Sequence, residues 1–390
     1  MDKNPRIEVA DVLRGFVVMG IILLHSIEHF NFYSYPDTSH QSWFLSFTDQ
    51  AIWDSLFFTF GGKAYAIFAL LFGFSFFIQD DNQRKRGIDF RLRFMWRLVL
   101  LFIIGNFNAA FFTAEILVMY SLVGFILVLV CRLPDRISFW LAVIFLLQPI
   151  EWVKVISAYM DPEFVPVHSL VGYYFGRAAE VQASGNFWET LRVNLWEGQL
   201  ASLTWAWEHG RIFQTAALFI LGMLLGKKQW LVYSEKHLKI WLFLAAGAII
   251  AYFPLAGLKN MLPGFMVNPV ALGAMQAILQ SLANFALMIL LIVGVICAFY
   301  CTRLHSLLAG LIPYGRMSLT NYLTQSMVGS FLFYNWGLGL HRYLGITASL
   351  GIGIVLFLLQ FFFCKWWFQS HSHGPFEQLW KKATWIGKKS

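Results

Sequence analysis

The sequence is poor in charge and in cysteine. Asp, Glu, Lys and Arg make up only 13% of its 390 residues, whereas soluble domains carry about 25%, so the composition argues against a soluble protein. The four cysteines form no Cys-x-x-Cys pair, which leaves disulfide and zinc interpretations without support. Hydrophobic residues, by contrast, make up 58% of the chain and are grouped in long runs. These features predict an all-α, polytopic integral membrane protein.

About 20 apolar residues are needed to cross a bilayer, and the apolar runs predict about ten transmembrane helices. Gly61-Gly62 predicts a break in the second run, and Pro149 predicts a kink in the fifth. Residues 151–210 are rich in acidic and aromatic side chains, which is typical of an amphipathic region at the outer interface; a substrate-binding lid is the alternative. The predicted spans are residues 11–27, 51–78, 94–112, 114–131, 137–156, 211–226, 240–258, 275–300, 316–334 and 346–368.

The positive charges predict the orientation. Only six of the 29 Lys and Arg residues fall outside in this topology, as the positive-inside rule requires, so both termini are expected in the cytoplasm. The net charge of +8 then reflects membrane orientation, and no nucleic-acid partner is expected. Three parts are predicted: an N-terminal membrane half with the candidate site (1–150), an outer interfacial region (151–210) and a C-terminal membrane half (211–390).

The first two predicted spans and the loop between them concentrate ionisable residues, which are rare at membrane depth. His29 and His40 are candidate general bases, because imidazole titrates near neutral pH. His25 lies four residues before His29, but no third ligand is evident, so no metal site is predicted. Asp54 or Glu28 is a candidate to orient the base. Lys63, about 13 Å farther along a helix, cannot pair with Asp54 in one straight helix and is expected to line a cavity.

Two further groups are candidates for cofactor binding. Asp11 and Arg14 are three residues apart and predict an ion pair at the cytoplasmic mouth, which either shapes a cofactor site or anchors the helix. Arg316, Asn321 and Gln325 belong to a polar stripe on the ninth predicted span. Such a stripe either makes interhelical hydrogen bonds or, at Arg316, binds a phosphate.

Several motifs resemble those of a known family. They are Asp11-Val12-Leu13-Arg14-Gly15-Phe16, Gly62-Lys63 followed by Phe68-Ala69-Leu70-Leu71-Phe72-Gly73, the block from Gly315 to Ser326, and Gly374-Pro375-Phe376-Glu377-Gln378-Leu379-Trp380. With these motifs the chain resembles the YeiB-like family of bacterial inner-membrane proteins, which has a C-terminal domain of unknown function. The resemblance covers nearly the whole chain and implies a multi-pass protein of the bacterial cytoplasmic membrane. Glu115 departs from the family pattern, where aspartate is expected.

A wider resemblance is to transmembrane acyltransferases such as heparan-alpha-glucosaminide N-acetyltransferase. Those enzymes share the Asp-x-x-Arg-Gly motif at the start of the first span and use a histidine of the outer loop that follows it. In this chain, the segment His40-Gln41-Ser42-Trp43 is similar to the sequence around that histidine. The resemblance implies acyl-CoA as cofactor, held by Arg14, Arg316 and cations of the predicted cytoplasmic cluster from Arg84 to Arg97, and His40 or His29 as base toward a small-molecule, glycan or lipid acceptor. Lys63 or Asn321 would stabilise charge on the thioester oxygen.

Two other functions remain open from the sequence. In a transporter or lipid flippase, Asp54, Lys63 and Glu115 would be coupling groups along a path through the membrane. In a lipid-binding scaffold there would be no turnover. Membrane lipids are expected partners in every case, and a homodimer is the assembly considered.

Overall fold

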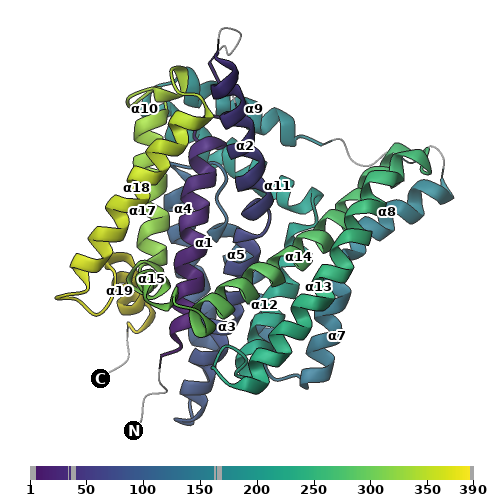
Figure 1. The fold of residues 1–390 in the computed structure, drawn as a ribbon, viewed down its shortest axis with the longest axis vertical. Helices are drawn as coiled ribbons and strands as arrows, with labels where there is room; N and C mark the ends of the chain where they lie inside the picture. Colours follow the sequence, from purple (N-terminus) through teal and green to yellow (C-terminus); the bar gives the residue numbers. More distant parts are fainter. Residues whose placement is uncertain (1–5, 34, 37–40, 162–163, 165–168, 387–390) are drawn as a thin grey trace.

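The computed structural model describes residues 6–33, 35–36, 41–161, 164 and 169–386, and these residues contain helices but no strand. Figure 1 shows a helical molecule in which both termini lie at the same end. The helices are α1 (Glu8–Ile27), α2 (Trp43–Thr59), α3 (Ala64–Arg84), α4 (Arg91–Ala109), α5 (Leu117–Val123), α6 (Phe125–Val130), α7 (Asp135–Leu146), α8 (Pro149–Met160), α9 (Val171–Ser184), α10 (Phe187–Val193), η1 (Asn194–Gly198), α11 (Gln199–Glu208), α12 (Arg211–Lys227), α13 (Glu235–Met261), η2 (Leu262–Gly264), α14 (Pro269–Cys301), α15 (His305–Ala309), α16 (Ile312–Arg316), α17 (Ser318–Phe333), η3 (Leu340–Arg342), α18 (Ile346–Trp367) and α19 (Pro375–Thr384).

The number of helices able to cross a membrane is smaller than predicted. By length and composition, six described segments qualify, or up to eight if each of two bent helix pairs is one span. Two predicted spans are short: α5 and α6 together form the apolar segment Leu117–Val130, and α17 has 16 residues. At 1.5 Å per residue, α17 is about 24 Å long, less than the roughly 30 Å of a hydrocarbon core. The structure therefore supports a membrane protein of six to eight candidate spans, and the count of ten is not confirmed.

Both predicted helix breaks are confirmed. Around Gly61-Gly62 the chain leaves α2 at Thr59 and begins α3 at Ala64, and Gly62 has a φ of +73°, which favours glycine. Pro149 is the first residue of α8, and α7 and α8 are bent by 48°. The predicted outer region was expected to begin at residue 151, but this residue lies inside α8. Helix α8 packs along α14. The three-part division of the chain stays a prediction.

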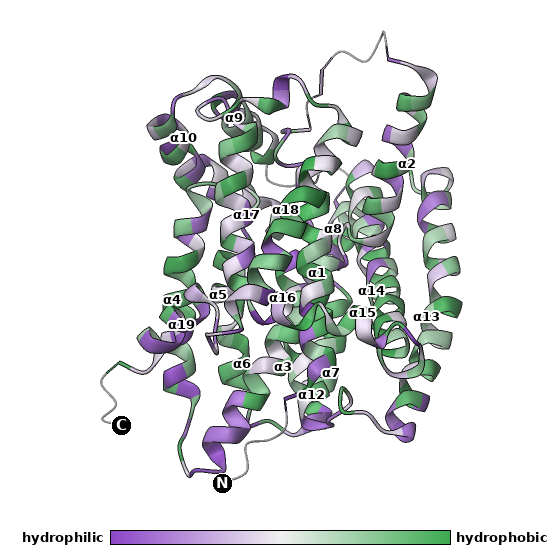
Figure 2. Cartoon of the chain, turned by 60° about the vertical axis from the view of Figure 1, so that its left-hand side comes forward, coloured by the Kyte–Doolittle hydropathy of each residue, from purple (hydrophilic) through white to green (hydrophobic). Residues whose placement is uncertain are grey.

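Helix α1 is the centre of the packing. It is largely buried and contacts α3, α16, α17 and α18, while α13 and α18 expose large apolar side chains such as Phe243 and Phe362. Figure 2 shows the hydrophobic colouring along these outer helices. Contiguous apolar surface of this kind is what lipid would cover.

Helices α3 and α12 pack closely and run in the same direction. Tyr65 bonds to Gln214 near their first residues, and Phe77 lies against Gly226 near their last. Glycines allow the close approach: a Cβ added at Gly222 would lie 1.9 Å from the carbonyl oxygen of Leu70. The N-terminal ends of α3 and α12 therefore lie side by side.

Candidate functional site

A cavity of about 870 Å³ lies inside the helical bundle, within the size range of small-molecule sites. Its walls are mainly apolar and aromatic side chains of α1, α3, α4 and α5. Its polar side chains include three groups, namely the terminal end (Arg14 and Arg97), the central cations (Lys63 and Arg211) and the histidine end (His25, Glu28 and His29), and Glu115 also lines it. Arg14 and His25 both belong to α1, so the two ends are separated by about 16 Å along that helix.

The terminal end combines a paired arginine with a stacked one. Arg14 donates to the buried Asp11 at 2.5 Å and to the Ser75 hydroxyl at 2.7 Å, which confirms the predicted Asp11–Arg14 ion pair. Arg97, from the predicted cytoplasmic cluster, lies over the Trp380 ring at 4.1 Å, and its Nε is buried without a partner among the described residues. Trp380 also lines the cavity, so α19 closes this end.

The central cations lie where the N-terminal ends of α3 and α12 meet. Lys63 is 5% exposed, lines the cavity as predicted, and donates to the carbonyl oxygens of Phe57 and Gly61 at 3.1 and 2.7 Å. Arg211 lies over the Tyr65 ring at 4.4 Å, and its Nη1 is buried without a hydrogen-bond partner in the described part of the chain. Neither cation forms an ion pair with a described carboxylate. Two helix N-termini add further positive potential here, so the centre favours an anion.

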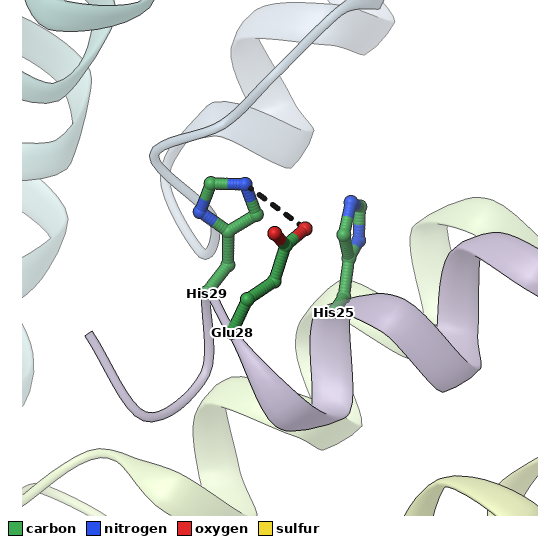
Figure 3. Close-up of side chains that lie close together, drawn as sticks. All are labelled: His25, Glu28 and His29. Carbon is green, nitrogen blue, oxygen red and sulfur yellow. Dashed lines mark ion pairs between the residues drawn. The ribbon is translucent and has the colours of Figure 1, made fainter. Parts of the chain in front are cut away.

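The histidine end is formed by a tight turn after α1. The helix ends at Ile27, and the backbone nitrogen of Tyr33 then bonds to the carbonyl oxygen of Glu28 at 3.1 Å. This turn places the Glu28 carboxyl between two imidazoles (Figure 3): its Oε1 is 3.4 Å from His29 Nε2, and the His25 and His29 ring centroids are 5.3 Å apart. The four-residue spacing places the His25 and His29 side chains on one helix face only if the helix continues beyond His29. The helix ends at Ile27, and the turn brings the two imidazoles together instead.

Burial determines the protonation of this group. Glu28 and His29 both follow the last residue of α1. Burial raises the pKa of the Glu28 carboxyl to about 8 and lowers the pKa of the His29 imidazole to about 4, since a charged form is poorly solvated there. At pH 7 both groups are therefore neutral. The Tyr33 hydroxyl donates to Glu28 Oε2 at 3.0 Å and orients the carboxyl.

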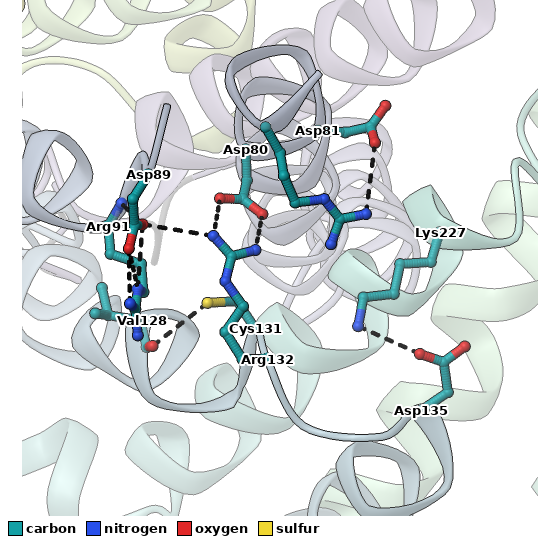
Figure 4. A network of polar contacts seen from close by, with 10 residues as sticks. Asp80, Asp81, Asp89, Arg91, Val128, Cys131, Arg132, Asp135 and Lys227 are labelled. Atoms are coloured by element: carbon teal, nitrogen blue, oxygen red, sulfur yellow. Dashed lines mark hydrogen bonds and ion pairs between the residues drawn. The ribbon is translucent and has the colours of Figure 1, made fainter. Parts of the chain in front are cut away.

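A second set of charged residues forms ion pairs between neighbouring segments outside the cavity (Figure 4). Arg132 bonds to Asp80 at 2.8 Å and lies 3.4 Å from Asp89, and Lys227 bonds to Asp135 at 3.2 Å. None of these residues lines the cavity. We interpret them as a structural network that fixes the end of α3 against its neighbours.

Comparison with known proteins adds a family. Residues 225–387 match the family model described as "Protein of unknown function (DUF418)". The chain is 26% identical over 409 residues to the uncharacterized protein YxaH of Bacillus subtilis (98% of this chain, 95% of that protein). It is 25% identical over 416 residues to the uncharacterized protein YeiB of Escherichia coli K12 (98% and 97%). The chain is therefore similar to YeiB and YxaH over nearly its whole length, and its C-terminal segment matches the DUF418 model. No solved structure matches it.

The segment that matches the DUF418 model supplies only part of the cavity. Gln280, Asn284, Tyr322 and Trp380 come from it, whereas the histidine end and both central cations come from residues before 225. The relatives' names and the family description carry no activity. Any function must therefore be argued from the site itself.

The structure brings together some predicted site residues and separates others. His29, Lys63 and Arg14 line one cavity, while His40 lies outside the described residues. Asp54 was predicted to orient the base, but it is exposed on α2, accepts a hydrogen bond from Gln50, and does not line the cavity.

The polar stripe on the ninth predicted span also lies away from the cavity. Arg316 stacks on Phe368 at 4.0 Å and donates to the Ser372 carbonyl oxygen, so it does not reach the cavity. Asn321 is buried and bonds to the Tyr314 carbonyl oxygen at 3.0 Å. Gln325 is buried without hydrogen-bond partners. The stripe thus serves mainly helix packing, the alternative that the sequence left open.

One cavity residue, Arg211, was not singled out from the sequence, and His25 and Glu28 were considered only as half of an incomplete metal pair and as an alternative group to orient the base. Arg211 was treated as a topological marker, although a cation at the first residue of an apolar helix is a signal for a buried site. His25 and Glu28 complete the order His-x-x-Glu-His, which also occurs in one class of zinc peptidases and so indicates metal chemistry. This pattern was available in the sequence.

Proposed function

We propose that the protein transfers an acyl group from cytoplasmic acyl-CoA to a hydroxyl or amine at the outer face of the membrane. The observation that supports this is the continuous cavity, which has arginines at its terminal end and a histidine–carboxyl group at its histidine end. The polar, anionic part of the donor would bind toward Arg97, and the acceptor would meet the histidine end. An elongated thioester is the class of ligand that fits such a separation of charges.

The reaction would proceed by attack of the acceptor oxygen on the thioester carbonyl. The C–O bond forms, the C–S bond breaks, and the acceptor's proton moves by way of the histidine end to the sulfur, giving an ester and free CoA. His29, neutral at pH 7, is the base when the group holds no ion, with Glu28 at 3.4 Å beside it. Lys63 has an N–H beyond the two bonded to carbonyl oxygens, and this N–H is available to the thioester oxygen.

Ligand-dependent stability tests the donor. Because a ligand that binds only the native state raises its stability by mass action, an acyl-CoA should raise the Tm of the purified protein more than free ADP or pantetheine does. Arg97→Gln should reduce this shift. Arg316→Gln is the matched control, since Arg316 lies away from the cavity. If no CoA thioester raises the Tm, or if both variants reduce the shift equally, the donor assignment is wrong.

Transport of an anion is a second candidate, and the central cations favour it. Lys63 and Arg211 form no ion pair with a described carboxylate, and they lie beside a break between helices, a common arrangement in transporters. In proteoliposomes a transporter would move an organic anion in a Lys63-dependent way without consuming acyl-CoA. Consumption of acyl-CoA with no anion flux would favour the transferase.

For topology, we propose ten membrane crossings with both termini and residue 87 in the cytoplasm of a bacterium, and assembly as a homodimer. The proposal adds the short segments Leu117–Val130 and α17 to the eight candidate spans, which requires local thinning of the bilayer around them. An impermeant maleimide on intact cells should label a cysteine at position 185 and spare one at 87. The reverse pattern would invert the topology, and a monomeric mass in detergent would count against the dimer.

A further inference from the structure

We propose that His25, Glu28 and His29 form a zinc site at the histidine end of the cavity. One ligand atom from each residue lies within 4.8 Å of the other two. Two imidazoles and one carboxylate are ligands that zinc prefers, and three protein ligands are typical of catalytic rather than structural zinc.

The distances suit a small tetrahedral ion. Zinc bonds of 2.0–2.1 Å place neighbouring ligand atoms about 3.3 Å apart, and Glu28 Oε1 is already 3.4 Å from His29 Nε2. The widest separation of up to 4.8 Å must shorten by about 1.5 Å to reach that value, which side-chain rotation can supply. Calcium, with six to eight oxygen ligands, does not suit this group.

The turn after α1 is built for these three side chains. Phe32 and Tyr33 have φ values of 55° and 56°, a backbone conformation that residues other than glycine rarely adopt. The turn brings the Tyr33 hydroxyl to Glu28 Oε2 at 3.0 Å, which leaves Oε1 directed toward His29. Partners of this kind orient a metal-binding carboxylate. Unusual backbone conformations that persist in a fold are concentrated at functional sites.

An unpartnered nitrogen points to a missing ligand. His25 Nδ1 is buried and has no hydrogen-bond partner among the described residues. The Phe112 ring packs against both imidazoles, with centroids 4.7 and 5.6 Å away, so this side of the group is apolar. A bound ion would give the buried nitrogen a partner and would favour the ionised form of the Glu28 carboxyl.

The fourth coordination position faces the cavity, because all three ligands line it. Zinc makes a bound water or hydroxyl much more acidic. If the proposed acyl transfer holds, the acceptor hydroxyl occupies this position, loses its proton to water and attacks the thioester; the departing thiolate then takes up a proton from water. That catalytic role rests on the proposed function, whereas binding of the ion does not.

Metal binding can be measured without any acyl donor. Protein purified with a tag free of histidine, stripped with a chelator and dialysed, should bind one Zn²⁺ per chain, and Zn²⁺ should raise its Tm. Glu28→Gln and His29→Gln should each weaken Zn²⁺ binding at least 100-fold, and Tyr33→Phe should weaken it about tenfold. His237→Ala is the control, since His237 lies in the first turn of α13 and does not line the cavity.

The outcomes separate the two proposals. Absence of Zn²⁺ binding in the stripped, monodisperse protein, or binding that neither Glu28→Gln nor Tyr33→Phe alters, overturns the zinc site. If the variants of the zinc ligands do not fold, the Zn²⁺ affinity of Tyr33→Phe and the number of Zn²⁺ ions bound per wild-type chain still test the site. Zinc binding without acyl transfer would leave the site standing and refute the transferase. Acyl transfer at full rate by the zinc-free protein would refute the role of the ion.

Discussion

Replacing Gly222 with alanine should separate α3 from α12 and destabilise the protein. The new Cβ would lie 1.9 Å from the Leu70 carbonyl oxygen and 2.9 Å from the Phe74 nitrogen, both backbone atoms that cannot rotate away. An ordinary contact begins at 3.4 Å, so the helices must move apart locally by about 1.5 Å. Overpacking of this kind typically costs about 1–3 kcal/mol.

The stability change of Gly222→Ala can be compared with that of a glycine-to-alanine substitution at an open position of the same protein. Gly247, in α13, has nothing within 4 Å of its added Cβ. Alanine there should stabilise by about 0.5–1 kcal/mol, because glycine is unfavourable inside a helix. Both substitutions add the same methyl group. Opposite signs of their stability changes would therefore show that the effect at Gly222 comes from the contact between α3 and α12.

Thermal unfolding in detergent, followed by the fluorescence of a thiol-reactive dye at the buried cysteines, measures both variants. We expect Gly222→Ala to lower the Tm by several degrees and Gly247→Ala to leave it unchanged or slightly higher. The separation should also shift the N-terminal ends of α3 and α12, where the central cations lie, so ligand binding should weaken together with stability. A Gly222→Ala protein as stable as the wild type would show that α3 and α12 are not packed at this distance.

Three further predictions concern charged groups. Lys63→Met should lower stability by about 1–3 kcal/mol, because two carbonyl oxygens lose their donor; a rise in Tm would instead show that repulsion between the central cations dominates. Asp80→Asn should cost about 1–3 kcal/mol by removing the buried carboxylate that Arg132 bonds at 2.8 Å and leaving that arginine only the 3.4 Å contact with Asp89, whereas Asp81→Asn, whose partner Lys85 is exposed, should cost less than 1 kcal/mol; equal Tm losses would contradict this. Burial raises the pKa of the Glu377 carboxyl, so its contribution is present at low pH and lost as pH rises through that pKa; the wild type should lose Tm relative to Glu377→Gln as the pH rises above the ordinary carboxyl pKa of 4.5, and parallel pH curves would refute the shift.

The features that sequence reasoning predicted are those with local causes. The break at Gly61-Gly62 and the bend at Pro149 follow from the backbone preferences of glycine and proline, and both occur. The Asp11–Arg14 pair follows from helical spacing. The position of Lys63 in the cavity follows from the cost of placing a charge in lipid, which allows few alternatives.

The features that sequence reasoning missed depend on tertiary packing. Asp54 and Lys63 seemed to belong to one site because they are close in sequence, yet the break between α2 and α3 leaves one at the surface and the other inside. Arg211 reaches the cavity only because α12 packs beside α3. The count of ten spans is not confirmed, because hydropathy does not show where a run of apolar residues folds into short helices, as in Leu117–Val130.

The spacing of the polar groups bears on the choice between acyl transfer and transport. A small free anion needs only the central cations, and it gives no reason for a histidine–carboxyl group farther along the same cavity or for the arginines of the terminal end, of which Arg14 lies about 16 Å from that group along α1. An elongated donor explains all three groups at once: its charged portion binds to the arginines, its reactive carbonyl lies near Lys63, and the acceptor meets His29. The decisive comparison is therefore between ligands of equal charge and different length. A short phosphate ester that stabilises the protein as well as a full acyl-CoA does would favour transport, and a clear preference for the long thioester would favour transfer.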